Sequence, residues 1–223
     1  MAKRSYEQFC PLAYTLDLVG ERWTLLIVRD LIAGPKRYTD LSRGLPGLAT
    51  DLLTERLRRL EEAGALGRRE LPPPAAATVY ELTERGHELL PAVLALARFG
   101  VGLLAEDPAS GGTPNREHFA LLLRVLFAAE GAPARPETWV FESDAGAVAV
   151  TAGKEGLDVR SVDEPPEGTS TRFVAGVPTI VEWVFGKLDT SAALADGRLR
   201  VEGDDGALER MRAAFPAPQP AYS

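Results

Sequence analysis

The sequence is poor in the residue types on which secreted, metal-binding and many catalytic proteins depend. Its 223 residues include one cysteine, two histidines and one asparagine, Asn115, which Arg-Glu follows. An intrachain disulfide and an N-glycosylation site are therefore both excluded. No apolar run approaches the roughly 20 residues of a membrane span, and the basic N-terminus has no apolar stretch typical of a secretory signal. These absences predict a cytoplasmic protein with no membrane partner.

Sequence motifs that carry catalysis are also missing. There is no Gly-x-Ser-x-Gly elbow, phosphate-binding loop, dinucleotide fingerprint or metal-spaced cluster. His87 and His118 fall inside predicted helices, and the lone cysteine has no evident partner. The sequence therefore predicts no enzyme, no cofactor and no metal site.

The charge is distributed unevenly along the chain. Residues 1–100 carry 14 Lys and Arg against 13 Asp and Glu, a net charge of +1, whereas the remainder carries 11 against 19, a net charge of −8. Such asymmetry indicates two domains. An acidic domain beside a DNA-binding one is expected to face away from the nucleic acid.

Residues 38–81 organise the first half, after two apolar helices predicted over residues 10–19 and 23–33. A short helix, a Leu45-Pro46-Gly47 turn and a longer helix over residues 50–63 come first. Two alternating segments, 65–71 and 78–82, then follow as strands on either side of an uncharged tip. This order predicts a winged helix-turn-helix, which places one helix in the DNA major groove.

The helix predicted over residues 50–63 has a buried stripe and a polar face. Leu53, Leu57 and Leu60 recur at helical spacing and form the stripe. On the other face, Arg58 has the chemistry to pair with guanine, and Asp51 or Glu55 to accept from cytosine. The alternative is a solvated helix face on which Glu55 simply pairs with Arg59. The candidate DNA-binding residues are Lys36, Arg37, Thr39, Thr50, Asp51, Thr54, Arg58, Arg68 and Arg69.

A long apolar helix is predicted over residues 83–105. Its leucines, valines and Phe99 cover most of its surface. Such a helix after a wing favours a dimer interface, the alternative being that it only closes the small core.

Residues 10–99 resemble the HxlR family of bacterial winged-helix regulators. The matching pieces are Cys10-Pro11, GERWTLLIVRDL from residue 20, GPKRYTDLSRGLPGLATDLLTERLRRLEEAG from residue 34, and YELTERG ending at Gly86. The resemblance implies a homodimer on a pseudo-palindromic DNA operator. It also places Cys10 where some relatives sense oxidants, although a lone cysteine on an apolar helix is also a common core residue.

The second half reads as a separate α+β domain after a linker over residues 107–114. Its predicted helices cover residues 116–129, 177–188 and 205–215, and its predicted strands cover residues 139–142, 148–152, 157–162, 172–175 and 198–202. The apolar helix over residues 177–188 has to bury two sides.

The segment KLDTSAALADGRLRVEGDDGALERMRAAF, residues 187–215, resembles the sterol-carrier-protein type-two fold. For residues 115–216 the resemblance implies a mixed sheet with helices around an apolar cavity for a hydrophobic molecule. The alternative for each lining residue is ordinary core packing. The candidate lining residues are Phe119, Leu123, Phe127, Trp139, Phe141, Phe173, Ile180, Trp183 and Val184.

Taken together, the sequence predicts a one-component transcriptional regulator. Residues 1–106 form the DNA-binding and dimerisation domain, residues 115–216 the domain that senses a hydrophobic small molecule, and residues 217–223 a tail. Two alternatives stay open: a second domain that serves only dimerisation or protein interaction, and redox sensing through Cys10.

Overall fold

The computed structural model describes residues 5–73, 76–106, 115–204 and 206–218. Its contacts divide the chain into two units, Met1–Val93 and Leu94–Ser223. The division falls inside helix α6 (Leu90–Glu106). The linker predicted over residues 107–114 lies outside the described residues.

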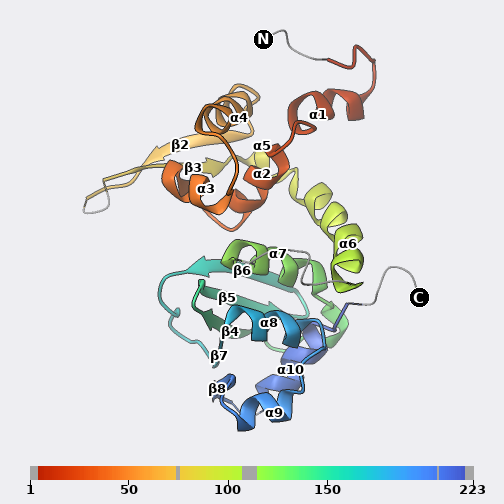
Figure 1. The fold of residues 1–223 in the computed structure, drawn as a ribbon, viewed down its shortest axis with the longest axis vertical. Helices are drawn as coiled ribbons and strands as arrows, with labels where there is room; N and C mark the ends of the chain where they lie inside the picture. The colour runs from red at the N-terminus through yellow and green to blue at the C-terminus, as the bar shows by residue number, and fades with distance from the viewer. Residues whose placement is uncertain (1–4, 74–75, 107–114, 205, 219–223) are drawn as a thin grey trace. The chain divides into compact units, whose positions relative to one another are not determined.

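The first unit contains a three-stranded antiparallel sheet in the order β1-β3-β2 and a set of short helices (Figure 1). Its elements are α1 (Pro11–Val19), α2 (Thr24–Ile32), β1 (Lys36–Arg37), α3 (Tyr38–Gly44), α4 (Thr50–Glu62), β2 (Leu66–Glu70), β3 (Thr78–Leu82) and α5 (Glu84–His87). This is the predicted winged helix-turn-helix: α3 and α4 form the helix-turn-helix, and β2 and β3 form the wing.

The core of this unit includes the buried faces of α2 and α4. The predicted stripe of α4 is confirmed, because Leu53, Leu57 and Leu60 are each at most 1% exposed. Ile27 and Leu31 of α2 are also buried, at 0% and 2% exposed. Full burial of one such side chain contributes roughly 1.5–3 kcal/mol, so the buried leucines hold α4 by one face and leave the opposite face exposed.

Two arginines of α4 are used inside the protein. The guanidinium of Arg59 donates to the backbone oxygen of Asp17 at 3.0 Å, at the end of α1. Arg56, 8% exposed, pairs with Glu21 at 3.2 Å. Both arginines therefore fix α4 against the N-terminal part of the unit.

The helix predicted over residues 83–105 is two helices, α5 and α6. The hydroxyl of Thr83 accepts from the Gly86 backbone amide at 3.1 Å and caps α5. Pro91 then stands in the first turn of α6, where its missing amide hydrogen is tolerated. A Cβ on Gly86 would come within 2.0 Å of the Ala65 oxygen, so glycine is required where α5 meets β2.

The second unit is an α+β domain with a five-stranded mixed sheet in the order β6-β5-β4-β7-β8. Strands β4 and β7 run parallel and the other neighbours antiparallel. The elements after α6 are α7 (Arg116–Leu126), a 3-10 turn (Ala129–Gly131), β4 (Glu137–Ser143), β5 (Gly146–Gly153), β6 (Gly156–Val162), β7 (Thr171–Ala175), α8 (Val177–Val184), α9 (Thr190–Ala195), β8 (Leu199–Gly203) and α10 (Ala207–Ala214).

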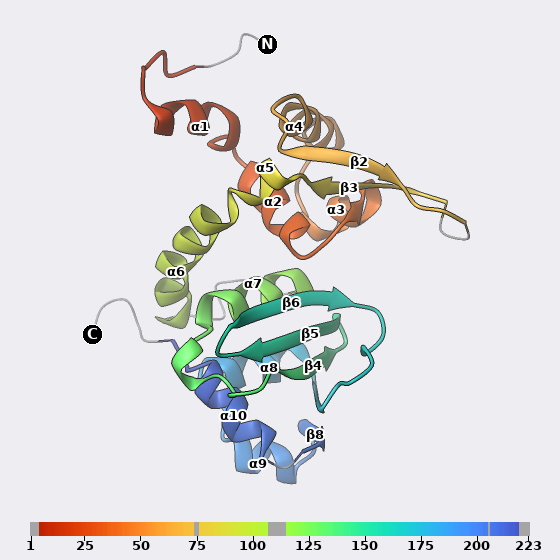
Figure 2. The ribbon, with the colours of Figure 1, turned by 180° about the vertical axis from the view of Figure 1, so that it is seen from behind.

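Helix α8 covers one face of this sheet. It lies in front of the strands in Figure 1 and behind β4, β5 and β6 in Figure 2. Beneath the helices, Phe141 stacks on Phe173 with ring centroids 5.1 Å apart, and Trp183 of α8 lies 5.2 Å from Phe173. This aromatic cluster is the core of the second unit.

Helix α8 is shorter than the predicted segment over residues 177–188. It ends at Val184, and Gly186 follows with a positive φ of 68°, a conformation that glycine adopts without strain. A further helix, α9, was not predicted. Its N-cap, Asp189, accepts from the Ala192 amide at 3.1 Å.

Candidate nucleic-acid interface and apolar cleft

A tyrosine hydroxyl links the first residue of α3 to the first turn of α4. The Tyr38 hydroxyl, at the start of α3, donates to the Thr50 backbone oxygen at 3.0 Å. It also lies 3.3 Å from the Thr54 hydroxyl, which itself donates to the Thr50 oxygen. This contact fixes the first turn of α4, the turn that enters the groove in helix-turn-helix proteins. Sequence reasoning missed Tyr38 because its partners lie 12 and 16 residues away.

Most of the predicted DNA-binding residues are exposed in the first unit. They are Arg37 and Thr39 before and on α3, Thr50, Asp51, Thr54 and Arg58 on α4, and Arg68 and Arg69 on β2.

Lys36 does not fit the predicted phosphate contact. It lies in β1, opposite Tyr80 of β3, and is only 8% exposed. The two-residue strand β1 was not predicted from the sequence, and the pairing with β3 turns this side chain inward.

Arg43 was not among the predicted contacts, although its position suits one. It is exposed on α3 and, within the described part of the chain, forms no ion pair. A guanidinium placed on the first helix of a helix-turn-helix is available to a DNA phosphate. In the sequence, Arg43 follows Asp40 by three residues, the spacing of a common ion pair on a helix surface. Nothing in the sequence therefore marked Arg43 as a DNA contact.

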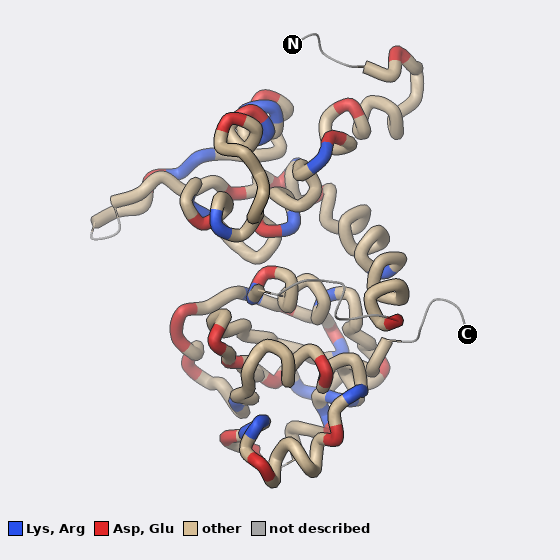
Figure 3. The backbone as a smooth tube through the Cα atoms, in the orientation of Figure 1, with Lys and Arg blue, Asp and Glu red and all other residues tan. Residues whose placement is uncertain are grey.

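The remaining three arginines of the predicted surface are paired with carboxylates. Arg58 pairs with Glu62 one turn further along α4. Arg68 pairs with Glu61 at 2.9 Å and its guanidinium lies 5.3 Å from the Tyr80 ring centroid. Figure 3 accordingly shows basic and acidic residues together on α4. Arg69 pairs with Glu81 across the wing at 3.0 Å.

The wing strands agree with the sequence prediction to within a residue or two. Arg68 of β2 stands opposite Tyr80 of β3, and the Leu71 amide donates to the Ala77 oxygen at 2.9 Å, beyond the ends of the strands. Residues 74–75 of the uncharged tip lie outside the described residues.

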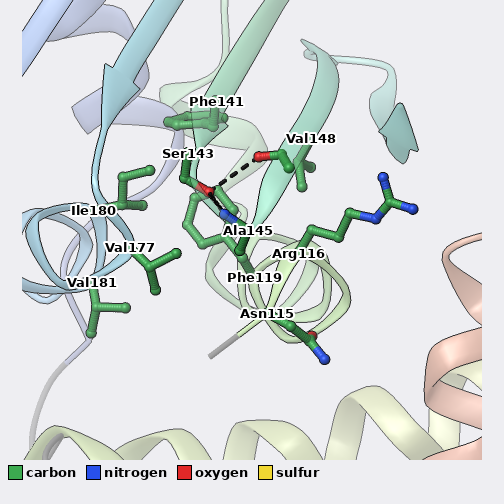
Figure 4. A pocket seen from close by; sticks show the side chains of 11 residues that line it. Asn115, Arg116, Phe119, Phe141, Ser143, Ala145, Val148, Val177, Ile180 and Val181 are labelled. Carbon is green, nitrogen blue, oxygen red and sulfur yellow. Dashed lines mark hydrogen bonds between the residues drawn. The ribbon is translucent and has the colours of Figure 1, made fainter. Parts of the chain in front are cut away.

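The second unit has an apolar cleft between α7, α8 and the β4–β5 hairpin. Figure 4 shows Val177, Ile180 and Val181 of α8 facing Phe119 of α7, with the guanidinium of Arg116 directed away from them. The rest of the lining comes from Asn115, which precedes α7, and from the β4–β5 hairpin, with Phe141, Ser143, Ala145, Gly146 and Val148. At the rim the Val177 amide donates to Asp144 at 3.2 Å.

This cleft is narrower than the cavity that the sequence predicted. The space open to the centre of a water-sized sphere is about 20 Å³, which is enough for about one water molecule. Of the nine predicted lining residues only Phe119, Phe141 and Ile180 border it.

The other six predicted lining residues pack away from the cleft. Leu123, Trp139, Phe173, Trp183 and Val184 are at most 1% exposed, and Phe127 packs on Phe215 with centroids 5.8 Å apart. For these residues the structure favours core packing.

Two half-buried arginines join helices to the rest of the second unit. Arg212 of α10 lies over the Trp183 ring, 5.2 Å from its centroid, and donates to the Trp183 backbone oxygen at the end of α8. Arg124 of α7 donates to the Val159 backbone oxygen. Burial lowers the pKa of both guanidinium groups. Their positions match a structural role, since each satisfies a carbonyl.

The carboxylates with displaced pKa values are not arranged as catalytic acids. Backbone donation from Arg198 lowers the pKa of Asp196, and the Arg210 side chain lowers the pKa of Asp204. Among the residues that the structure describes, no group of three or more His, Cys, Asp and Glu is placed to hold a metal ion.

Cys10 is the N-cap of α1 and is half-buried with a free thiol. Its backbone amide donates to the Gln8 oxygen at 2.8 Å. The redox role implied by the resemblance stays a prediction.

Several exposed apolar side chains lie on α1 and α6. On α6, Leu96, Phe99 and Leu103 are 58%, 71% and 43% exposed. The segment Glu84–Glu106 is also long and apolar enough, by length and composition, to cross a membrane, and 17% of its most apolar stretch is buried. The sequence expectation that no segment reaches this length therefore does not hold here.

The fold and the exposed α4 face define a winged helix-turn-helix protein. Residues 18–107 match the family described as HxlR-like helix-turn-helix. An uncharacterized HTH-type transcriptional regulator of Synechocystis is 36% identical over 44% of this chain and 73% of its own length. The chain belongs to this HxlR-like family.

Two further similarities each cover about two fifths of the chain. An uncharacterized HTH-type transcriptional regulator of Mycobacterium tuberculosis is 41% identical over 38% of this chain, and the match spans 53% of its own length. The solved structure of the reduced transcriptional regulator YodB from Bacillus subtilis is 32% identical over 40% of this chain and 89% of its own, with a TM-score of 0.37.

Proposed function

We propose that the protein is a sequence-specific DNA-binding regulator of transcription that acts in the bacterial cytoplasm. The observation that carries this proposal is the exposed polar face of α4, with Thr50, Asp51, Thr54 and Arg58, in a chain of the HxlR-like family. The opposite face of α4 is fixed by its buried leucines and by Arg56 and Arg59. A rigid helix with one free polar face is what reading a groove requires.

In this proposal α4 lies in the major groove. Arg58 reads guanine through its forked guanidinium, and Asp51 accepts from cytosine. Arg37, Thr39 and Arg43 contact phosphates beside the groove. Arg68 and Arg69 of the wing contact the neighbouring DNA phosphates. Phosphate contacts fix the position of α4, and the α4 side chains supply the sequence preference.

The protein acts as a homodimer whose interface includes α6. An exposed stripe of Leu96, Phe99 and Leu103 supports this assignment, as do the exposed Leu12 and Tyr14 of α1. A second copy covers such a surface in water at a gain of roughly 25 cal/mol per Å². Two copies of α4 would then read half-sites about 34–36 Å apart.

The second unit senses a hydrophobic small molecule in the cleft between α7 and α8. The apolar lining of Phe119, Phe141 and Ile180 supports this role, which the sterol-carrier-like reading also implies. Because the cleft holds about one water molecule, the ligand has to separate α7 from α8. The ligand-bound unit therefore differs in shape from the free unit. Such a difference is what allows ligand binding to change the DNA affinity.

The alternative is a second unit that serves only as an interaction module. Val177→Leu, which adds one methylene to the lining of the cleft, separates the two. If the unit senses a ligand, this variant keeps its DNA affinity but loses any response to hydrophobic metabolites. Fluorescence anisotropy of labelled operator, titrated with a metabolite panel, measures both quantities. A response equal to that of the wild type would leave the cleft without a sensing role.

The DNA-binding function is tested by selecting binding sites from a random duplex library with the full-length protein. A palindromic consensus is expected. Arg58→Ala should weaken binding and relax the preference at one position in each half-site by about 1–3 kcal/mol. Arg135→Ala, an exposed change in the second unit, serves as the control. Recovery of no consensus would refute the proposal.

A further inference from the structure

Three arginines of the proposed DNA-facing surface are already bound to glutamates within the same chain. The pairs are Arg58–Glu62, Arg68–Glu61 at 2.9 Å and Arg69–Glu81 at 3.0 Å. Glu61, Glu62 and Glu81 are called here the competing glutamates. A carboxylate and a phosphate engage the same forked face of a guanidinium, so each arginine can serve only one of them fully at a time.

Helix stability does not explain where Glu61 and Glu62 stand. They occupy the last turn of α4, where the helix dipole is negative and favours cations over carboxylates. In the Arg58–Glu62 pair the arginine precedes the glutamate, which is the weaker of the two i,i+4 orders. Both glutamates thus lie where they gain least from the helix and most from the arginines.

The pairs are exposed enough to exchange partners. The six side chains are between 34% and 60% exposed, and ion pairs this open to water are weak and screened by salt. A DNA phosphate can therefore replace each glutamate, but every replacement subtracts from the affinity that the arginine contributes.

The arginines near α3 differ from those of α4 and the wing. Arg37 and Arg43 form no ion pair among the residues that the structure describes. The competition is therefore confined to α4 and the wing, the elements that read or flank the bases.

We propose that the competing glutamates set the operator affinity of the protein by holding Arg58, Arg68 and Arg69 until DNA displaces them. The inference rests on the proposed DNA-binding function and adds to it three affinity-determining residues that do not contact DNA. Free protein thereby keeps its base-reading and wing arginines neutralised, which lowers its attachment to DNA of any sequence.

The test is a double-mutant cycle on the full-length protein, with binding to the selected operator measured by fluorescence anisotropy. Glu61→Gln releases Arg68 and should tighten binding about twofold to fivefold, the range expected for one exposed pair. Glu70→Gln is the matched control. It removes the same charge from an exposed wing position that has no ion pair in the described residues.

The second arm separates release of the arginine from plain repulsion between Glu61 and DNA. In an Arg68→Ala background, Glu61→Gln should leave the affinity unchanged, because the residue through which it acts is gone. Circular dichroism confirms that each variant is folded. The same cycle applies to Glu81 with Arg69.

The outcomes separate the inference from the function on which it rests. Tighter binding by Glu61→Gln in the presence of Arg68 and no change in its absence supports the competition. Equal tightening in both backgrounds, or equal tightening by Glu70→Gln, overturns it and leaves DNA binding intact. A wild-type protein that binds no DNA refutes the proposed function itself.

Discussion

The Tyr38 hydroxyl links the start of α3 to the start of α4 in the helix-turn-helix. The Tyr38 oxygen donates to the Thr50 carbonyl at 3.0 Å and lies 3.3 Å from the Thr54 hydroxyl. Thr50 and Thr54 are both proposed to contact DNA, so Tyr38 acts on the interface through them. It is a positioning residue.

Tyr38→Phe should therefore weaken DNA binding more than it destabilises the fold. Loss of one partly exposed hydrogen bond costs about 0.5–1.5 kcal/mol, and the ring itself stays in place. Urea unfolding measures the first effect and operator titration the second. Tyr6→Phe, at a tyrosine that is 56% exposed and outside the proposed interfaces, is the control. A variant with unchanged operator affinity would show that Tyr38 does not position α4.

Asp204 provides a residue-scale prediction about pH. Donation from Arg210, and from the Gly206 amide at 3.1 Å, lowers its pKa below the ordinary value of 3.8. A lowered folded-state pKa means that the contribution to stability is present above the unfolded pKa and is lost as the pH falls through the folded one. Acidification to pH 3 and below should therefore destabilise the second unit.

Asp204→Asn removes this titration, so its urea midpoint should change less between pH 7 and pH 2.5 than that of the wild type. Glu164→Gln is the matched control, because Glu164 is exposed and has no ion pair in the described part of the chain. Equal acid sensitivity in wild type and Asp204→Asn would count against the assignment.

At the scale of elements, the sequence predicted what local spacing determines. Leu53, Leu57 and Leu60 recur within a single helix, so their burial followed from periodicity alone. The burial of Lys36 could not follow from it, because β1 exists only by pairing with β3, some 44 positions away. The break before α6 had a local signal in Pro91, which the apolar pattern around it outweighed.

The same limit applies to the proposed cleft. Phe119 of α7 and Phe141 of β4 line it. Trp139, two residues before Phe141 on β4, is fully buried beside Phe215. The composition indicates that many residues are apolar, but which of them border the cleft depends on how α7 and α8 pack on the sheet. That packing depends on contacts between elements far apart in the chain.

Helix α6 leads to a prediction about assembly. Phe99→Glu places a charge in the centre of the exposed stripe with Leu96 and Leu103, where a dimer interface would bury it without a partner. The variant should be monomeric by light scattering and should bind single half-sites only weakly.

Arg98→Glu, a neighbouring exposed position outside the stripe, changes the charge more and should remain dimeric. A dimeric Phe99→Glu would exclude α6 from the interface. A monomer that keeps full operator affinity would contradict the proposed reading of two half-sites.

At the scale of the whole molecule, the net charge of −7 is carried by the second half of the chain. DNA affinity therefore depends on a few arginines that are positioned locally, and salt should reveal how many take part. Each phosphate contact contributes a slope of about −0.9 to the dependence of log affinity on log salt concentration. In a dimer, Arg37→Ala removes two contacts and should make the slope shallower by about 1.8. Arg135→Ala makes the same charge change in the second unit. A slope that shifts equally in both variants would mean that Arg37 acts through the overall field and does not touch a phosphate.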